Sequence, residues 1–96
     1  MNKGEFVDIL AEKTETTKKD SKEALDSTLE VITEALEDGK EVLFVGFGKF
    51  EPRARSATER LNPQTGEVID VPAKVVPKFK AGKPLKEIVK ENLDPV

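Results

Sequence analysis

The prolines in the second half of the chain constrain its fold more than any other feature. They stand at positions 52, 63, 72 and 77. Proline lacks a backbone N–H and clashes with the preceding helical turn, so this spacing leaves no room for an α-helix between residues 50 and 80. Within sheets, proline is confined to edge strands. The sequence therefore predicts a long two-stranded hairpin with its tip near residues 60–67, where "NPQTG" has ordinary turn chemistry.

Two helices are predicted ahead of this hairpin. Asn2 and Thr17 are their candidate N-caps, because short polar side chains accept hydrogen bonds from the first free N–H groups of a helix. Asp38–Gly39 closes the second helix, which is about 20 residues, or roughly 30 Å, long. The outer face of this helix is acidic, and one apolar stripe follows its other side at helical spacing. The stripe comprises Leu25, Leu29, Ile32 and Leu36.

The pattern changes to β after the second helix. The run "EVLFVGFGKF" is β-branched and aromatic and predicts one strand over residues 41–50. Gly46 and Gly48 within it imply a bend or a close approach of backbones. After the hairpin, Lys83–Pro84 begins a short helix, since proline is favoured at the first helical position. We expect an α+β fold in one domain over residues 1–96, with a helical dimerisation part (1–38), a sheet and β-arm (40–82), a C-terminal helix (83–92) and a polar tail.

The chain outside the hairpin is small for an independent domain. Without residues 53–76 about 72 residues remain, and a core of that size is marginal alone. A two-stranded ribbon cannot support itself in water either. Both problems are eased when two chains pack their long helices and strands together, so we predict a homodimer. Its core is expected to contain the apolar stripe of the second helix together with Phe44, Phe47, Phe50 and Phe79.

Composition argues against the commonest catalytic and metal-binding chemistries. The chain has no histidine and no cysteine, so it lacks the most frequent general base, a thiolate nucleophile and the usual zinc ligands. Its glycines do not form a phosphate-binding loop ahead of a helix. The N-terminus has no apolar run that would predict a signal peptide or a membrane span. We therefore expect a cytoplasmic protein that is not an enzyme and needs no metal or cofactor.

Charge is distributed unevenly, although the net charge is only −3. Residues 1–45 have 6 basic and 12 acidic side chains, whereas residues 46–86 have 9 basic and 4 acidic ones. Alternation along a ribbon places the cations of each strand on one face, where they can contact nucleic-acid phosphates and release counterions. These cations are Arg53 and Arg55 on the outgoing strand and Lys74, Lys78 and Lys80 on the return strand, with Arg60 near the tip.

The hairpin tip has the groups that a minor-groove contact requires. Asn62 and Gln64 can donate hydrogen bonds to the N3 and O2 acceptors of bases. Pro63 is rigid, apolar and without an N–H, so it can enter between two base pairs as a wedge and kink the duplex. The same residue types are also common in turns that bind nothing. The basic ribbon beside the tip is what favours the DNA-binding interpretation.

Several motifs resemble those of the HU/IHF family, the histone-like DNA-bending proteins of bacteria and some of their phages. They are "MNKGEFVDIL", "VGFGKFEPRAR", "NPQTGE" and "VPKFKAGKPLK", and the resemblance runs from Met1 to about Lys90. It implies the IHF-like DNA-binding fold: an intertwined homodimer with a helical base, a short antiparallel sheet and two protruding β-ribbon arms that reach around double-stranded DNA in the minor groove.

The resemblance also assigns roles by position. Pro63 is the wedge that intercalates. The other arm contacts are Arg53, Arg55, Arg60, Asn62, Gln64 and Thr65. The phosphate contacts on the body are Lys3, Lys18, Lys80, Lys83 and Lys86, and we add Gly46, Lys74 and Lys78 to the expected DNA-binding set.

The sequence departs from that family ahead of the tip. The run "SATERL" places Thr58, Glu59 and Leu61 where such arms commonly have more positive charge, and the chain is acidic overall. We therefore expect an architectural protein that binds more weakly than a fully basic relative. It should bend and compact DNA in the nucleoid with little sequence specificity, and prefer bent, nicked or flexible duplexes. A heterodimer with a related chain is left open.

A second function class is also left open. In this alternative the chain is a protein-interaction module that keeps the same scaffold, has reduced DNA affinity and binds a protein partner through its acidic helical face.

Overall fold

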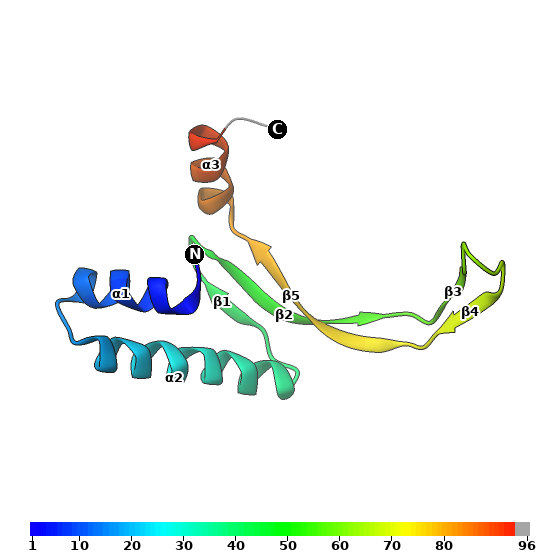
Figure 1. Ribbon diagram of the computed structural model, residues 1–96, viewed down its shortest axis with the longest axis horizontal. Coiled ribbons are helices and arrows are strands. Elements are labelled where there is room, and N and C mark those ends of the chain that lie inside the picture. The colour runs from blue at the N-terminus through cyan, green and yellow to red at the C-terminus, as the bar shows by residue number, and fades with distance from the viewer. Residues whose placement is uncertain (94–96) are drawn as a thin grey trace. The chain divides into compact units, whose positions relative to one another are not determined.

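A computed structural model describes residues 1–93, and the predicted polar tail lies mostly outside this range. The chain divides into two compact units, Met1–Ala35 and Leu36–Val96. The elements make an α+β fold (Figure 1). In order they are α1 (Lys3–Thr14), α2 (Lys18–Glu37), β1 (Val42–Phe44), β2 (Gly48–Arg55), β3 (Thr58–Leu61), β4 (Val68–Val71), β5 (Lys74–Ala81) and α3 (Lys83–Asn92).

The first unit is a helical hairpin whose ends are fixed by local hydrogen bonds. The Asn2 side chain accepts a hydrogen bond from the Glu5 N–H at 2.9 Å. Thr17 Oγ1 accepts one from the Asp20 N–H at 3.1 Å. Both predicted N-caps are therefore confirmed. Within residues 1–93, no helix combines the length and the apolar character that crossing a membrane requires.

In the second unit, residues 41–50 contain two paired strands joined by a tight turn, rather than the single strand that the sequence predicts. The chain reverses at residues 45–47, so that Val42 pairs with Phe50 and Phe44 with Gly48. Gly46 has a φ of 85°, a left-handed conformation that glycine adopts at little cost. The Phe47 N–H donates to the Phe44 carbonyl at 2.9 Å and closes the turn. The one-strand prediction is wrong because Gly46 reverses the chain instead of bending it.

Gly48 lies at the close approach of backbones that the sequence predicts. A Cβ atom built there would lie 2.5 Å from Phe79 Cζ and 2.6 Å from the Lys80 carbonyl oxygen. The Phe79 ring packs on Phe47 and Phe50, with centroid separations of 5.6 and 4.8 Å. The glycine thus lets this aromatic cluster lie directly on β2.

We expect Gly48→Ala to lower the free energy of unfolding by about 1–3 kcal/mol, because the added methyl overlaps both a ring and a carbonyl. Urea unfolding followed by circular dichroism measures the change. Gly4→Ala is the matched control, because its methyl meets only Asn2 Oδ1 at 3.4 Å and alanine favours the helix. A Gly48→Ala protein as stable as the wild type would contradict this packing.

The hairpin forms two ribbons instead of the single one predicted. The basal ribbon, β2 with β5, pairs from Gly48↔Ala81 to Arg55↔Lys74. The distal ribbon, β3 with β4, pairs from Thr58↔Val71 to Leu61↔Val68. Between them, residues 56–57 and 72–73 are unpaired, and we call this interruption the break. The break leaves two residues unpaired on each side of the hairpin, so the strand register of the basal ribbon continues in the distal ribbon. We call both ribbons and their tip the arm (Figure 1).

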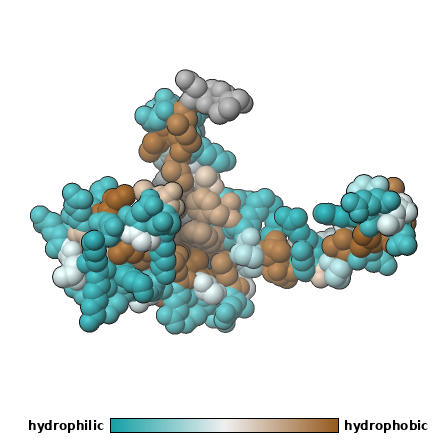
Figure 2. Space-filling model, in the orientation of Figure 1, coloured by the Kyte–Doolittle hydropathy of each residue, from teal (hydrophilic) through white to brown (hydrophobic). Residues whose placement is uncertain are grey.

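A single chain leaves most of its apolar side chains uncovered. Within residues 1–93, Val7 and Ala11 are the only buried apolar residues. Leu29 is 47% exposed and Phe47 49%, and Figure 2 shows hydrophobic atoms on the surface of α3. One chain cannot bury a core of its own, which is the condition that favours association. None of the residues predicted for the dimer core is buried: Leu25, Leu29, Ile32, Leu36, Phe44, Phe47, Phe50 and Phe79.

Candidate nucleic-acid interface

The basal ribbon gathers the predicted cations on one face. Arg55 lies directly opposite Lys74, and Arg53 and Lys78 occupy positions of the same alternation. These four side chains are exposed. They form no ion pair with any residue between 1 and 93. Their charge is therefore available to an external anion.

Arg60 joins these cations, although strict alternation would place it elsewhere. It lies opposite Ile69 in the distal ribbon, and unbroken alternation from Arg55 would put it on the face away from Arg53 and Arg55. Yet all three arginines line one hollow with Lys74 at the break. Strand pairing is interrupted at the break, so the alternation of side chains in the basal ribbon need not carry over into the distal ribbon. We call this the cationic hollow; Ser56, Thr58, Val71 and Pro72 complete its lining.

The tip is a compact turn that leaves Pro63 exposed. The Asn62 N–H donates to the Glu67 carbonyl at 2.7 Å, and the Gly66 N–H donates to the Asn62 carbonyl at 2.8 Å. Gly66 has a φ of 74°. Asn62 Oδ1 accepts from the Gln64 N–H at 2.9 Å, which leaves the amide nitrogen of Asn62 to donate outward. The tip is thus preorganised around the proline.

Lys80 differs from the other arm cations because it is ion-paired to a carboxylate that it shares with Lys49. Glu51 is buried, and its oxygens lie 3.1 Å from Lys49 Nζ and 3.3 Å from Lys80 Nζ. Hydrogen bonds from Lys49 and then Lys80 hold the pKa of Glu51 below its usual value. Lys80 can bind a phosphate only in competition with Glu51.

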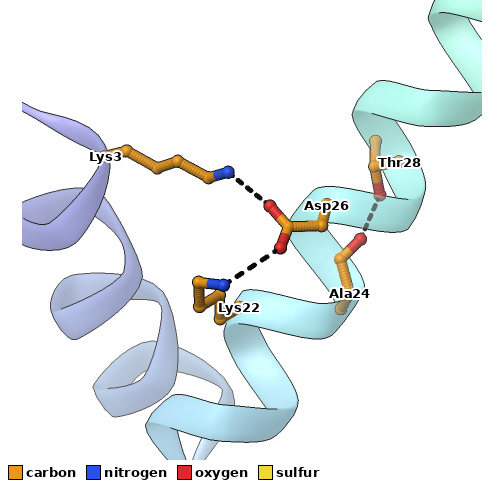
Figure 3. Close-up of polar contacts among 5 residues, drawn as sticks. All are labelled: Lys3, Lys22, Ala24, Asp26 and Thr28. Carbon is orange, nitrogen blue, oxygen red and sulfur yellow. Dashed lines mark hydrogen bonds and ion pairs between the residues drawn. The ribbon is translucent and has the colours of Figure 1, made fainter.

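Predicted phosphate contacts on the helices are also ion-paired. Lys3 pairs with Asp26, which Lys22 approaches at 3.4 Å (Figure 3). The hydrogen bond from Lys3 is the main cause of the lowered pKa of Asp26. Lys18 lies 3.2 Å from Asp8. Exposed pairs of this kind contribute little to stability, so phosphates can replace the carboxylate partners.

The remaining predicted contacts lie close to turns and to α3. Gly46 is in the β1–β2 turn, and Lys83 Nζ lies 4.0 Å from Glu87 Oε1 in α3. Lys86 is exposed on the same helix. The Thr65 hydroxyl accepts a hydrogen bond from the Glu67 N–H at 3.3 Å within the tip.

Two pairs without a cation lie on either side of Arg60 in the distal ribbon. Glu59 lies directly opposite Asp70, and Leu61 lies opposite Val68. The sequence shows the acidic residue ahead of the tip. It does not show that a second carboxylate faces it, because that depends on the strand register.

Comparisons with known proteins agree on one family. A family model described as "Bacterial DNA-binding protein" matches residues 1–90. The DNA-binding protein HU of Clostridium pasteurianum is 53% identical over 89 residues, which cover 93% of this chain and 98% of that protein. DNA-binding protein HU 1 of Bacillus subtilis is 49% identical over 89 residues, covering 93% and 97%.

Two solved structures are similar over nearly the full chain. A cocrystal structure of Anabaena HU with DNA has a TM-score of 0.87 and 50% identity, covering 94% of this chain and 98% of that one. HU from Thermotoga maritima has a TM-score of 0.68 and 46% identity, covering 94% and 100%.

Proposed function

This chain belongs to the family of bacterial DNA-binding proteins, and from that premise we propose that it is an architectural protein that binds double-stranded DNA as a dimer and bends it. One observation carries the proposal. Cations without ion-pair partners in the described chain line the arm, beside a preorganised tip with an exposed proline. The protein-interaction alternative is not favoured, because relatives of about 50% identity are named DNA-binding proteins.

The arm supplies affinity that does not depend on sequence. Each phosphate that it neutralises releases counterions, which favours binding at low salt. From Arg53 to Asn62 the strand can span roughly 30 Å at about 3.3 Å per residue. That length is close to one turn of duplex, about 34 Å. The arm can therefore follow a groove and bring its tip to the far side of the helix.

Pro63 supplies the bend in this mechanism. Opening one base step costs a few kcal/mol and kinks the duplex by roughly 20–90°. Phosphate contacts made by the arm and by the helical body offset that cost. A nicked or gapped duplex is already easier to deform, so it should be preferred over an intact one. The minor groove offers degenerate acceptors, so little sequence specificity is expected.

The dimer gives the bend its symmetry. Two chains cover each other's exposed apolar residues and present two arms, one on each side of the bound duplex. The protein would then act on the nucleoid in the cytoplasm. On the body, Lys3, Lys18 and Lys83 have carboxylate partners within the chain, which phosphates must replace when the body contacts DNA.

Gel shifts on three duplexes of one sequence test the proposal. The duplexes are intact, nicked, or lacking one central nucleotide, and salt is varied from 50 to 200 mM. We expect binding to all three, tightest for the gapped duplex, with a log–log salt slope shallower than about −9. Absence of binding at low salt would contradict the proposal, and equal affinity for all three would contradict the bending mechanism.

A further inference from the structure

Alternation along β3 places the charges of two neighbouring residues, Glu59 and Arg60, on opposite faces of the distal ribbon. Arg60 lines the cationic hollow, which has no carboxylate among its lining residues. Glu59 and Asp70 line a second hollow together with Ala57, Thr58, Val71 and Pro72, and no cation lines it. The arm thus has a basic side and an acidic side at the same level.

Nothing within the described chain neutralises the acidic side. Glu59 and Asp70 are exposed, and neither forms an ion pair with a residue between 1 and 93. Like charges placed directly opposite each other weaken a strand pair. The pair therefore disfavours the distal ribbon in the free protein. We look for its role in the contact between the arm and DNA.

A minor groove presents phosphates on both of its sides. Its width is about 6 Å, and charge is screened over about 8 Å at physiological salt. Both sides of an inserted arm therefore interact with a row of phosphates. A uniformly basic arm would bind both rows, whereas this arm attracts one row and repels the other.

We propose that the arm is one-sided: the cationic hollow binds phosphates of one DNA strand, while Glu59 and Asp70 keep the phosphates of the opposite strand away. The two carboxylates then determine how the arm lies in the groove. This inference rests on the proposed function. It adds that each arm binds the phosphates of only one of the two DNA strands.

Ethylation interference on the gapped duplex locates the phosphates that each protein needs. For the wild type, we expect interfering phosphates beside each arm on one strand only. In Glu59→Lys/Asp70→Lys they should appear on both strands. Two arms add four lysines, at about 0.9 of slope each, so the salt slope should steepen by about 3–4 and affinity should rise at least about a hundredfold at 0.1 M salt.

Glu30→Lys/Glu34→Lys is the charge-matched control, since both residues are exposed on α2 on the side opposite its apolar stripe. It should leave the interference pattern unchanged. Glu59→Gln/Asp70→Asn removes the repulsion without adding cations. It should add interference on the second strand, weaker than that of the lysine variant, and it provides this test even if the lysine variant folds poorly.

Two results would overturn the inference. One is wild-type interference on both strands beside each arm. The other is arm variants that match the control in pattern and slope. Either result, with wild-type binding and bending intact, would leave the proposed function standing. Loss of the proposed function would instead appear as a wild-type protein that does not bind.

Discussion

Arg55→Ala/Lys74→Ala should weaken binding to intact duplex roughly a thousandfold at 0.1 M salt. These two residues face each other across the basal ribbon, and both line the cationic hollow. A dimer loses four cations, and each phosphate contact contributes about 0.9 to the log–log salt slope. The slope should therefore become shallower by about 3–4. Fluorescence anisotropy titrations between 50 and 200 mM salt measure both quantities.

The matched control is Lys13→Ala/Lys90→Ala, which removes the same charge outside the arm. It should change the slope by much less than the arm variant. Equal losses in the two variants would mean that net charge, and not the arm, governs binding.

Leu29→Lys should abolish the folded dimer at micromolar concentration. Leu29 lies on the apolar stripe of α2 and is 47% exposed in the single chain. It also borders an apolar hollow with Met1, Phe6 and Leu25. Loss of a leucine from an apolar contact costs about 2–5 kcal/mol, and a lysine charge there must also be desolvated. Because a dimer contains the change twice, the cost is comparable with a whole domain's stability of about 5–15 kcal/mol.

Sedimentation and circular dichroism at several concentrations check the dimer prediction. The wild type should sediment as two chains, and its melting temperature should rise with protein concentration. Ser27→Lys is the control, because position 27 lies about 200° around the helix from Leu29. A wild type that sediments as one folded chain, with a concentration-independent melting temperature, would contradict the dimer.

Features set by a few neighbouring residues were predictable from the sequence. Asn2 and Thr17 cap their helices through side chains that reach three residues ahead. Gly39 ends α2 with a φ of 75°. Gly66 closes the tip in the same backbone region. In each case the residue type favours the local feature: short polar side chains reach the free N–H groups of a helix start, and glycine adopts a positive φ at little cost, so no distant contact is needed.

Features that depend on register or on distant partners were not predictable. Alternation places Arg60 away from Arg53, but the break brings both to one hollow. The pairing of Glu59 with Asp70 joins strands that are 11 positions apart at that level. Sequence alone does not say where strand pairing will lapse, because Pro72 lies in the break whereas Pro52 and Pro77 lie within paired strands.

The internal ion pairs were missed for a related reason. Lys3 meets Asp26 across two helices, and Lys80 meets Glu51 across two strands. The sequence marks these lysines as free cations for DNA. Only the packing of elements shows that each of them already has a carboxylate partner, which a phosphate must replace.

The central claim is that Pro63 opens a base step, and the end-to-end distance of bound duplex tests it most directly. Donor and acceptor dyes at the two ends report the bend at saturating protein, for the wild type, Pro63→Ala and the tip control Glu67→Gln, whose exposed side chain has no assigned DNA contact. The account predicts a shortened distance for the wild type and the control, and a distance close to that of free duplex for Pro63→Ala. Equal shortening by the wild type and Pro63→Ala would contradict it.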